Sequence, residues 1–456
     1  MRLSLSDVLA ATGGTLEGPS APVTFGAVST DTREIGEGSL FLALKGERFD
    51  GHDFVEEALR RGAAGVVLSA GPAPGSVPAV RVADTLLALG ALGRFVRRRL
   101  GLRVIAVTGS VGKTTTKEMI GALLRAEGLR VLQTPGNLNN RIGLPLTLLS
   151  AVGDEETAVL ELGVSEPGEM AHLTRICEPD VAVITAVAAC HTERLGSVEG
   201  VAREKLSIAQ GLREGGTLVL PFGEPLLVAP AGVRAARFGW EPGAELRGEG
   251  LELHGNDGSS FRLGSVELDL PLPGRHNAEN ALAALAAVRA CGFSAERAPE
   301  ALASLRPSPL RGEVRAGVHG ARLYVDCYNA NPRAMEAALE TVATLAGSSR
   351  RVAVLGEMKE LGELCREGHA RVGRVAARLG YDELHLLGES CRWVGEAAVE
   401  AGLAPGKARV YGGKEELSEA LPGRLGPGDW VLIKGSRAMG LEAVAERLST
   451  PDQRTT

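Results

Sequence analysis

Short apolar runs alternate with helical patterns along nearly the whole chain. In residues 1–100 the runs SLFLAL, AGVVL and VPAVRV are separated by helix-like segments such as HDFVEEALRRG, and RVIAVTG follows from Leu102. Continuous apolar runs of this length, bounded by glycine, are typical of strands buried on both faces of a parallel sheet. The alternation predicts an α/β protein whose central sheet is mostly parallel.

Two changes of pattern divide the chain into three parts. A helical stretch closes in FVRRRLGL near Leu100, and the proline-rich segment RPSPLRG lies at residues 306–312. A length of 456 residues accommodates about three domains. We therefore predict an N-terminal domain at 1–100, a central domain at 101–308 and a C-terminal Rossmann-like domain at 309–456. The arginines 97 to 99 are expected to be solvated partners of a helix dipole.

Charge and cysteine usage exclude several classes of protein. The chain has 50 basic and 56 acidic residues, which give a net charge of −6. It therefore lacks the excess positive charge that binds a nucleic acid or an anionic membrane. The longest apolar stretch, Val181 to Cys190, is about half of a membrane span. The six cysteines form no C-x-x-C pair, which favours reduced thiols. We expect a cytoplasmic protein, monomeric, without membrane insertion or nucleic-acid partner.

A glycine-rich loop between a predicted strand and a predicted helix is the strongest local motif. It consists of Gly109, Ser110, Val111, Gly112, Lys113, Thr114 and Thr115. Backbone N–H groups at such a helix start can bind phosphate, Lys113 adds a positive charge, and the Thr114 hydroxyl can hold Mg²⁺. Val107 replaces the first glycine of the usual P-loop pattern, so the loop is a variant. The alternative is a glycine turn without a ligand.

Two further polar residues follow apolar runs. Glu161 ends TAVLELG, where a carboxylate would face the crevice at the carboxyl edge of the sheet and could hold a metal ion. His191 takes the equivalent position after VAVITAVAACH. A solvated glutamate and a structural histidine are the alternatives.

Lys205 lies on the apolar face of a predicted helix. In SVEGVAREKLSIAQGL, with Ser197 as the expected N-cap, Lys205 follows Val201 by four residues and shares its face. Burial disfavours the ammonium form and lowers the pKa of a lysine. A neutral amine can react with CO₂ to give a carbamate, whose oxygens can bind Mg²⁺. The alternative is a side chain that extends along the surface to reach solvent.

A third cluster of polar residues lies at the start of an alanine-rich helix. His276 and Asn280 share one face at a spacing of four residues, and Asn277 is three residues from Asn280. Helix capping explains one of these side chains. The set of three favours hydrogen bonds to a nucleotide base or ribose.

These motifs together resemble the Mur ligase family. TGSVGKTTT, GNLNN, LELG, the Cys190-His191 pair, the EK at Lys205 and GRHNAENALAA occur in the order typical of the family. VDCYNANPRAM, LGEMKELG and VLIKGSRAMGLE are similar to the member that adds the terminal dipeptide. One position differs, because the strand before His191 reads Ile184-Thr185-Ala186-Val187 where asparagine is expected.

The resemblance implies an activity and its cofactors. It implies ligation of D-alanyl-D-alanine to UDP-N-acetylmuramoyl-tripeptide, driven by ATP through an acyl phosphate, in peptidoglycan precursor synthesis. Lys113, Glu161, His191 and Lys205 are then the expected catalytic residues. Of two expected Mg²⁺ ions, one is assigned to Thr114 and Glu161, and the other to His191 and a carbamate on Lys205.

The resemblance also assigns residues to the three substrates. The expected ATP contacts beyond the P-loop are His276, Asn277, Asn280, Arg311 and Asp326. The expected UDP-sugar contacts are Ser29, Thr30, Asp31, Arg33, Lys45, Gly46, Asp50, Gly51, His52, Asn137 and Asn139. The expected dipeptide contacts are Tyr328, Asn329, Lys434, Ser436 and Arg437.

Two other functions fit part of the sequence. A sibling amide ligase, or a folate polyglutamate synthase, would share the P-loop and the metal residues, but the DCYNANP and KGSRAM segments argue against both. A P-loop regulator such as a GTPase would bind nucleotide without ligation. The chain has no N-K-x-D guanine motif, which disfavours this class.

Overall fold

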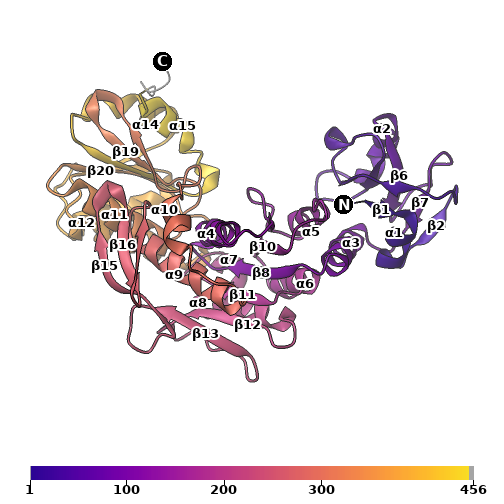
Figure 1. Cartoon of the computed structure of the whole chain (residues 1–456). Helices are drawn as coiled ribbons and strands as arrows, with labels where there is room; N and C mark the ends of the chain where they lie inside the picture. Colours follow the sequence, from indigo (N-terminus) through magenta and orange to yellow (C-terminus); the bar gives the residue numbers. More distant parts are fainter. Residues whose placement is uncertain (1, 451–456) are drawn as a thin grey trace, which may run out of the picture.

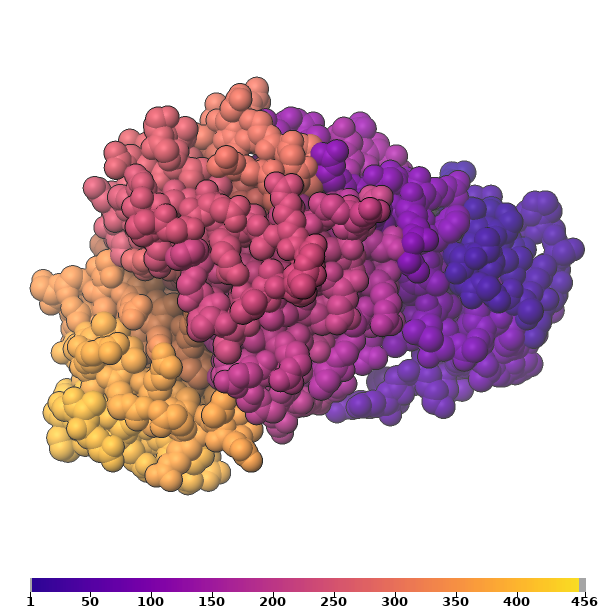
Figure 2. Space-filling model, turned by 90° about the horizontal axis from the view of Figure 1, so that it is seen from below, coloured from indigo at the N-terminus to yellow at the C-terminus, as the bar shows by residue number. Residues whose placement is uncertain are grey.

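The computed structural model describes residues 2–450, and these fold into three α/β units along the chain. Figure 1 shows the N-terminal unit and the C-terminal unit on opposite sides of the central one. The space-filling view in Figure 2 shows the same arrangement, with the indigo and yellow ends of the chain far apart. A substrate that contacts all three units must therefore extend along the central unit.

The N-terminal unit contains a five-stranded sheet in the order β2-β7-β6-β5-β4, in which only the β2/β7 pair is antiparallel. A short antiparallel pair, β1 and β3, adjoins it. The strands are β1 (Leu3–Ser4), β2 (Thr15–Glu17), β3 (Thr24–Phe25), β4 (Val28–Ser29), β5 (Ser39–Leu42), β6 (Ala63–Leu68) and β7 (Ala79–Arg81). The helices are α1 (Leu5–Thr12), η1 (Thr32–Glu34), η2 (Gly51–Phe54), α2 (Val55–Arg60) and α3 (Thr85–Arg99).

The central unit contains a fully parallel seven-stranded sheet in the order β14-β13-β12-β11-β8-β10-β9. Its strands are β8 (Arg103–Thr108), β9 (Val131–Gln133), β10 (Thr157–Glu161), β11 (Val181–Ile184), β12 (Thr217–Pro221), β13 (Arg234–Gly239) and β14 (Leu246–Arg247). A three-stranded antiparallel sheet consists of β15 (Glu249–Leu253), β16 (Ser259–Leu263) and β17 (Val266–Leu270).

Helices cover the central sheets. They are α4 (Lys113–Ala126), α5 (Gly143–Leu149), α6 (Glu169–Cys177), α7 (Thr192–Leu195), α8 (Val198–Leu206), η3 (Ser207–Gly211), η4 (Gly255–Asp257), α9 (Arg275–Ala290) and α10 (Ala298–Ala303). Every residue of β8 after Arg103 is buried, as expected of a strand covered on both faces. The predicted mixture of helices and a mostly parallel central sheet is confirmed.

The C-terminal unit contains a six-stranded sheet in the order β18-β19-β23-β20-β21-β22, with β18 as the antiparallel edge. Its strands are β18 (Glu313–Ala316), β19 (Arg322–Val325), β20 (Arg351–Gly356), β21 (Glu383–Leu387), β22 (Ala408–Tyr411) and β23 (Trp430–Lys434). Its helices are η5 (Val318–Gly320), α11 (Pro332–Ala346), η6 (Gly362–Leu364), α12 (Cys365–Arg378), η7 (Glu389–Cys391), α13 (Arg392–Glu400), α14 (Lys414–Ala420), η8 (Pro422–Arg424), η9 (Arg437–Met439) and α15 (Glu442–Leu448).

Side-chain caps begin the helices that position the site. Ser197 accepts a hydrogen bond from the Gly200 N–H at 3.2 Å and begins α8, as predicted. Asn331 accepts one from the Ala334 N–H at 2.9 Å, and Pro332 is the first residue of α11. Within residues 2–450 no helix is both long and apolar enough to cross a membrane. All six cysteines are free thiols.

The prediction that residues 97 to 99 are solvated was wrong for Arg97. Its side chain is buried, with 3% of the residue exposed, and donates to the backbone oxygens of Cys177 at 2.9 Å and Glu178 at 2.7 Å. It also contacts Asp180 at 3.3 Å. These acceptors lie at and after the C-terminal end of α6, so Arg97 ties α3 to the central unit. Arg98 instead makes an exposed ion pair with Glu178.

We predict that Arg97→Ala lowers the free energy of unfolding by about 2 to 4 kcal/mol, because it removes charge-assisted hydrogen bonds from buried carbonyls. Arg98→Ala is the matched control, and we expect it to cost less than about 1 kcal/mol, as exposed ion pairs do. Urea unfolding followed by circular dichroism measures both. Equal losses in the two variants would show that Arg97 is not a structural tie.

Candidate active site

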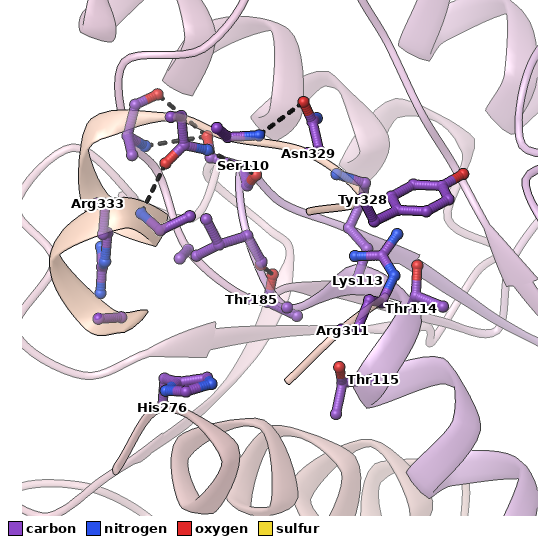
Figure 3. A pocket seen from close by; sticks show the side chains of 18 of the residues that line it. Ser110, Lys113, Thr114, Thr115, Thr185, His276, Arg311, Tyr328, Asn329 and Arg333 are labelled. Carbon is purple, nitrogen blue, oxygen red and sulfur yellow. Dashed lines mark hydrogen bonds between the residues drawn. The ribbon is translucent and has the colours of Figure 1, made fainter. Parts of the chain in front are cut away.

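The phosphate-binding loop joins β8 to α4 and leaves the start of the helix open. Gly112 is the N-cap of α4, with φ of +84°, and no side chain caps the helix there. The first N–H groups of α4 therefore have no side-chain acceptor and can donate to an anion. Figure 3 shows Ser110, Lys113, Thr114 and Thr115 around this point. The predicted context of strand, glycine loop and helix is present.

Two glycines hold this loop against its neighbours. A Cβ on Gly109 would lie 1.9 Å from Thr185 Oγ1, and a Cβ on Gly112 would lie 2.2 Å from Asn280 Oδ1. Thr185 stands in the segment where the family resemblance led us to expect asparagine. Its hydroxyl lies 2.5 Å from the Val111 carbonyl oxygen, to which it donates. The threonine thus fastens the P-loop to the chain after β11.

Lys113 is enclosed at the head of the loop. Its Nζ donates to the Gly109 carbonyl oxygen at 2.7 Å. Burial lowers the pKa of Lys113, the nearby charge of Glu161 opposes this shift, and the Arg311 charge adds to it. The Arg311 guanidinium stacks on the Tyr328 ring at 4.0 Å from its centroid (Figure 3). An arginine of the C-terminal unit therefore lies on the phosphate side of the P-loop.

Glu161 ends β10 and is 2% exposed. Its Oε2 accepts from Thr114 Oγ1 at 2.8 Å, and its Oε1 accepts from Asn139 Nδ2 at 2.9 Å. Lys117 Nζ lies 4.0 Å from the same carboxylate. Sequence reasoning gave Lys117 no role, although a lysine one turn after Lys113 in a helix with a buried face was a usable signal. Asn139 contacts Glu161, and its predicted UDP-sugar role stays a prediction.

Lys205 is the second enclosed lysine, and 2% of the residue is exposed. Burial lowers its pKa to about 8, with Cys190 and Glu204 opposing the shift and the Lys113 charge adding to it. The predicted core-facing position of Lys205 is therefore present. Nearby, Glu204 accepts from the N–H groups of Gly168 at 2.9 Å and Met170 at 2.8 Å, at the start of α6.

His191 immediately precedes α7 and lines the same cavity as Lys205. Burial lowers the pKa of His191, and the charges of Lys113 and Lys205 lower it further, while Glu360 opposes the shift. The ring Nδ1 forms a hydrogen bond with the Glu360 carboxylate of the C-terminal unit. The P-loop lysine, this histidine and Lys205 are thus close enough to influence one another's charge.

One cavity of about 1240 Å³ contains these groups. Its lining comes from the central and C-terminal units. Of the predicted residues it includes Ser110, Val111, Gly112, Lys113, Thr114, Thr115, Asn139, Glu161, His191, Lys205, His276, Asn277, Asn280, Arg311, Asp326, Tyr328, Asn329 and Lys434. The predicted phosphate, metal and nucleotide residues, apart from Gly109, therefore line a shared space.

Three of the residues predicted to contact the nucleotide lie at the start of α9. Asn277 Nδ2 donates to the Pro273 carbonyl oxygen at 2.8 Å and Asn280 Nδ2 to Asn277 Oδ1 at 3.4 Å. Burial lowers the pKa of His276, with the Asp326 charge opposing the shift. Arg333, on α11, lies across the cavity from His276 in Figure 3. Arg333 donates to the Val187 carbonyl oxygen at 3.1 Å and had no predicted role.

Several predicted residues lie outside this cavity. Ser436 accepts from the Lys359 N–H at 2.9 Å, and Arg437 pairs with Glu442 at 3.0 Å while its guanidinium lies 6.0 Å from the Tyr328 ring centroid. Asn137 and Gly109 are also outside it. These positions do not test the dipeptide role of Ser436 and Arg437, which stays a prediction.

The predicted UDP-sugar residues of the N-terminal unit do not line this cavity. Asp31 pairs with Arg33 at 2.5 Å, and this hydrogen-bonded pair lowers the pKa of Asp31 to about 2. Lys45 and Asp50 pair across their loop at 3.7 Å. His52 Nδ1 contacts Asp50 at 2.5 Å, and its Nε2 accepts from the Ser69 N–H at 3.0 Å. The group lies in the indigo unit of Figure 2.

The chain is similar to known proteins over almost its full length. The family model of the Mur ligase middle domain matches residues 107–288, that of the Mur ligase glutamate ligase domain matches 310–437, and that of the Mur ligase family catalytic domain matches 24–95. The UDP-N-acetylmuramoyl-tripeptide–D-alanyl-D-alanine ligase of Bacillus subtilis is 38% identical over 440 residues, which are 95% of this chain and 96% of that protein.

Solved structures agree with this similarity. A crystal structure of MurF from Acinetobacter baumannii matches with a TM-score of 0.89 and 31% identity, over 98% of both chains. MurF from Thermotoga maritima, in complex with ADP, matches with a TM-score of 0.81 and 32% identity, over 92% of this chain and 96% of that one. With the same three units in the same order as these structures and with three matching family models, the chain belongs to the Mur ligase family.

Proposed function

We propose that this chain is an ATP-dependent ligase that joins D-alanyl-D-alanine to UDP-N-acetylmuramoyl-tripeptide in peptidoglycan precursor synthesis. The observation that carries the proposal is the cavity in which the P-loop, the buried Lys205 and residues of the C-terminal unit meet. The names of the relatives from Bacillus subtilis and Acinetobacter baumannii support this choice of substrates.

The reaction needs ATP because a carboxylate does not condense with an amine unaided. Transfer of the γ-phosphoryl group to the tripeptide carboxylate gives an acyl phosphate, whose phosphate is a good leaving group. The amine of the dipeptide then attacks the carbonyl carbon, the C–O bond to phosphate breaks, and the amine loses a proton. The products are the amide, ADP and phosphate.

The P-loop would stabilise charge on the phosphoryl group. The open N-terminus of α4 offers backbone N–H groups, and Lys113 offers a positive charge at the same place. Arg311 approaches from the C-terminal unit and is held on the Tyr328 ring. Since Lys113 donates to its own loop at Gly109, we expect it to exchange this contact for a phosphate oxygen when ATP binds.

Thr114 and Glu161 are the residues that would hold Mg²⁺ on the ATP oxygens. Their oxygens are 2.8 Å apart, and oxygen donors are those that Mg²⁺ prefers. Among residues 2–450 no three His, Cys, Asp or Glu side chains cluster as a metal site. This suits an ion that takes most of its ligands from phosphate and water. When bound, such an ion neutralises charge developing on the phosphates.

We further propose that Lys205 carries a carbamate that, with His191, would hold a second Mg²⁺. Its support is a buried amine with a pKa of about 8 and no hydrogen-bond partner among the described side chains. Carbamylation would replace an enclosed cation beside Lys113 with an anion. The electrostatic repulsion between the two lysines would then become an attraction.

The dipeptide would be held by the C-terminal unit. Lys434 donates to Asp326 Oδ2 at 2.6 Å and to the Asn329 carbonyl oxygen at 3.1 Å, which fixes the loop after β19. We propose Tyr328, Asn329, Ser436 and Arg437 as the contacts that complete this site, with Arg437 pairing with the dipeptide carboxylate.

The N-terminal unit would hold the UDP-sugar through the group that contains Asp31, Arg33, Lys45, Asp50 and His52. The units of this proposal are residues 1–100, 101–308 and 309–456, and each would contribute one substrate site. ATP and the nucleotide-sugar are intracellular metabolites, so we place the reaction in the cytoplasm.

We predict that the protein converts ATP, UDP-N-acetylmuramoyl-tripeptide and D-alanyl-D-alanine to the pentapeptide in the presence of Mg²⁺. Mass spectrometry detects the product, and phosphate release should require both peptide substrates. Product formed only with another acceptor or amine would favour a sibling ligase or a folate polyglutamate synthase. ATP hydrolysis that is independent of any UDP-sugar would favour a P-loop regulator.

We predict that Lys205→Ala lowers the ligation rate by at least about 100-fold, because an electrostatic group aimed at the reacting atoms is lost. Formate or acetate should restore part of the rate, since a small carboxylate can take the place of the carbamate. Lys407→Ala, which removes a half-exposed lysine of the C-terminal unit, is the control. Full activity of the Lys205 variant would remove this residue from the mechanism.

The pKa of Lys205 predicts how fast the carbamate forms. With a pKa of about 8, roughly a tenth of the amine is neutral at pH 7 and about half at pH 8. Enzyme depleted of CO₂ should therefore regain activity roughly fivefold faster at pH 8 than at pH 7 when dissolved CO₂ is held constant. Reactivation rates equal at the two pH values would contradict a neutral amine as the reacting form.

A further inference from the structure

His191 and Glu360 meet across the junction between the central and C-terminal units. His191 immediately precedes α7, and Glu360 lies in the loop between β20 and η6. Both residues have left-handed backbone, with φ of +53° and +63°. This conformation is unfavourable for residues other than glycine, and such residues cluster at functional sites. The two strained positions contact each other directly, through a hydrogen bond between their side chains.

Two further hydrogen bonds join the residues after His191 to backbone oxygens of the loop that carries Glu360. Thr192 Oγ1 donates to the Leu361 carbonyl oxygen at 2.8 Å, and the Glu193 N–H donates to the Glu360 carbonyl oxygen at 3.2 Å. A Cβ on Gly362 would lie 2.9 Å from Glu193 Cα, so a larger residue has no room there. The loop that carries Glu360 is therefore fixed closely to the start of α7. Two exposed side chains can pair without such close packing of the backbone around them.

The contact determines which ring nitrogen of His191 is available. Nδ1 faces the Glu360 carboxylate, whereas His191 lines the cavity that contains Lys113 and Lys205. Nε2 has no hydrogen-bond partner among the described residues. A carboxylate on one nitrogen of a histidine fixes the orientation and tautomer of the ring. Here it leaves the Nε2 lone pair as the group that His191 can offer inside the cavity.

We propose that Glu360 is a positioning residue that orients His191 only when the C-terminal unit is docked on the central unit. Docking and completion of the catalytic centre then become one event, because the carboxylate that holds the ring comes from the other unit. This inference rests on the proposed function of the site. It adds Glu360 to a mechanism in which sequence reasoning gave that residue no part.

Kinetic measurements on three variants of the full chain test the proposal. Glu360→Ala should lower the kcat of ligation by about 10- to 100-fold, the usual effect of losing a carboxylate that orients a ligating histidine. Glu360→Gln should stay within about threefold of wild type, since its amide oxygen can accept the same hydrogen bond. Glu363→Ala removes an exposed carboxylate of the same segment and is the matched control; its rate should not change.

A double-mutant cycle separates positioning from a general structural effect. If Glu360 acts through His191, Glu360→Ala should add little to the loss caused by His191→Ala. Thermal unfolding shows whether each variant is folded. A fully additive loss, or a Glu360→Ala rate within threefold of wild type, would overturn the proposal.

Imidazole nitrogen chemical shifts give a readout independent of activity. In protein labelled with ¹⁵N-histidine, His191 should carry its proton on Nδ1 in wild type and in Glu360→Gln, and should lose this preference in Glu360→Ala. His191→Ala assigns the signal. Unchanged shifts in Glu360→Ala would overturn the proposed contact. Failure of wild type to ligate would instead overturn the proposed function, and the shifts would still test the contact.

Discussion

The enclosure of two lysine ammonium groups in one cavity is the constraint on which the rest of the site depends. Burial lowers the pKa of both Lys113 and Lys205, and the charge of Lys113 lowers that of Lys205 further. Such an arrangement is stable only where anionic groups, or anionic ligands, can compensate the charge. Glu161 supplies part of this compensation, and a nucleotide triphosphate would supply more. The positive charge of the site therefore favours the binding of phosphate, whose negative charge compensates it.

Contacts between the P-loop backbone and side chains of neighbouring segments hold the loop in place. The P-loop runs so close to Thr185 and Asn280 that only glycine fits at positions 109 and 112. Asn331 at the start of α11 donates to the Ser110 carbonyl oxygen at 3.3 Å, so the C-terminal unit also contacts the loop. The position of the loop thus depends on side chains from the segment after β11, from α9 and from the start of α11.

The catalytic centre consists of residues from two of the three units. The central unit contributes the P-loop and Lys205, whereas Arg311, Asp326 and Glu360 come from the C-terminal unit. The N-terminal unit lies at the far side of the central unit in both views of the molecule (Figures 1 and 2). The residues of this unit that are predicted for the UDP-sugar therefore lie in a different part of the molecule from the cavity.

The sequence by itself determined the elements and the local chemistry. The apolar runs predicted the parallel strands, and the glycine loop predicted the phosphate site. The helical spacing from Val201 predicted that Lys205 faces inward. These predictions were possible because strand burial and helix periodicity depend on residues that are neighbours in the sequence. Only the tertiary structure decided that Arg97 is buried, that Asn139 contacts Glu161 and that Glu360 reaches His191. Each of these contacts joins residues distant along the chain, and side-chain spacing within one element carries no information about such partners.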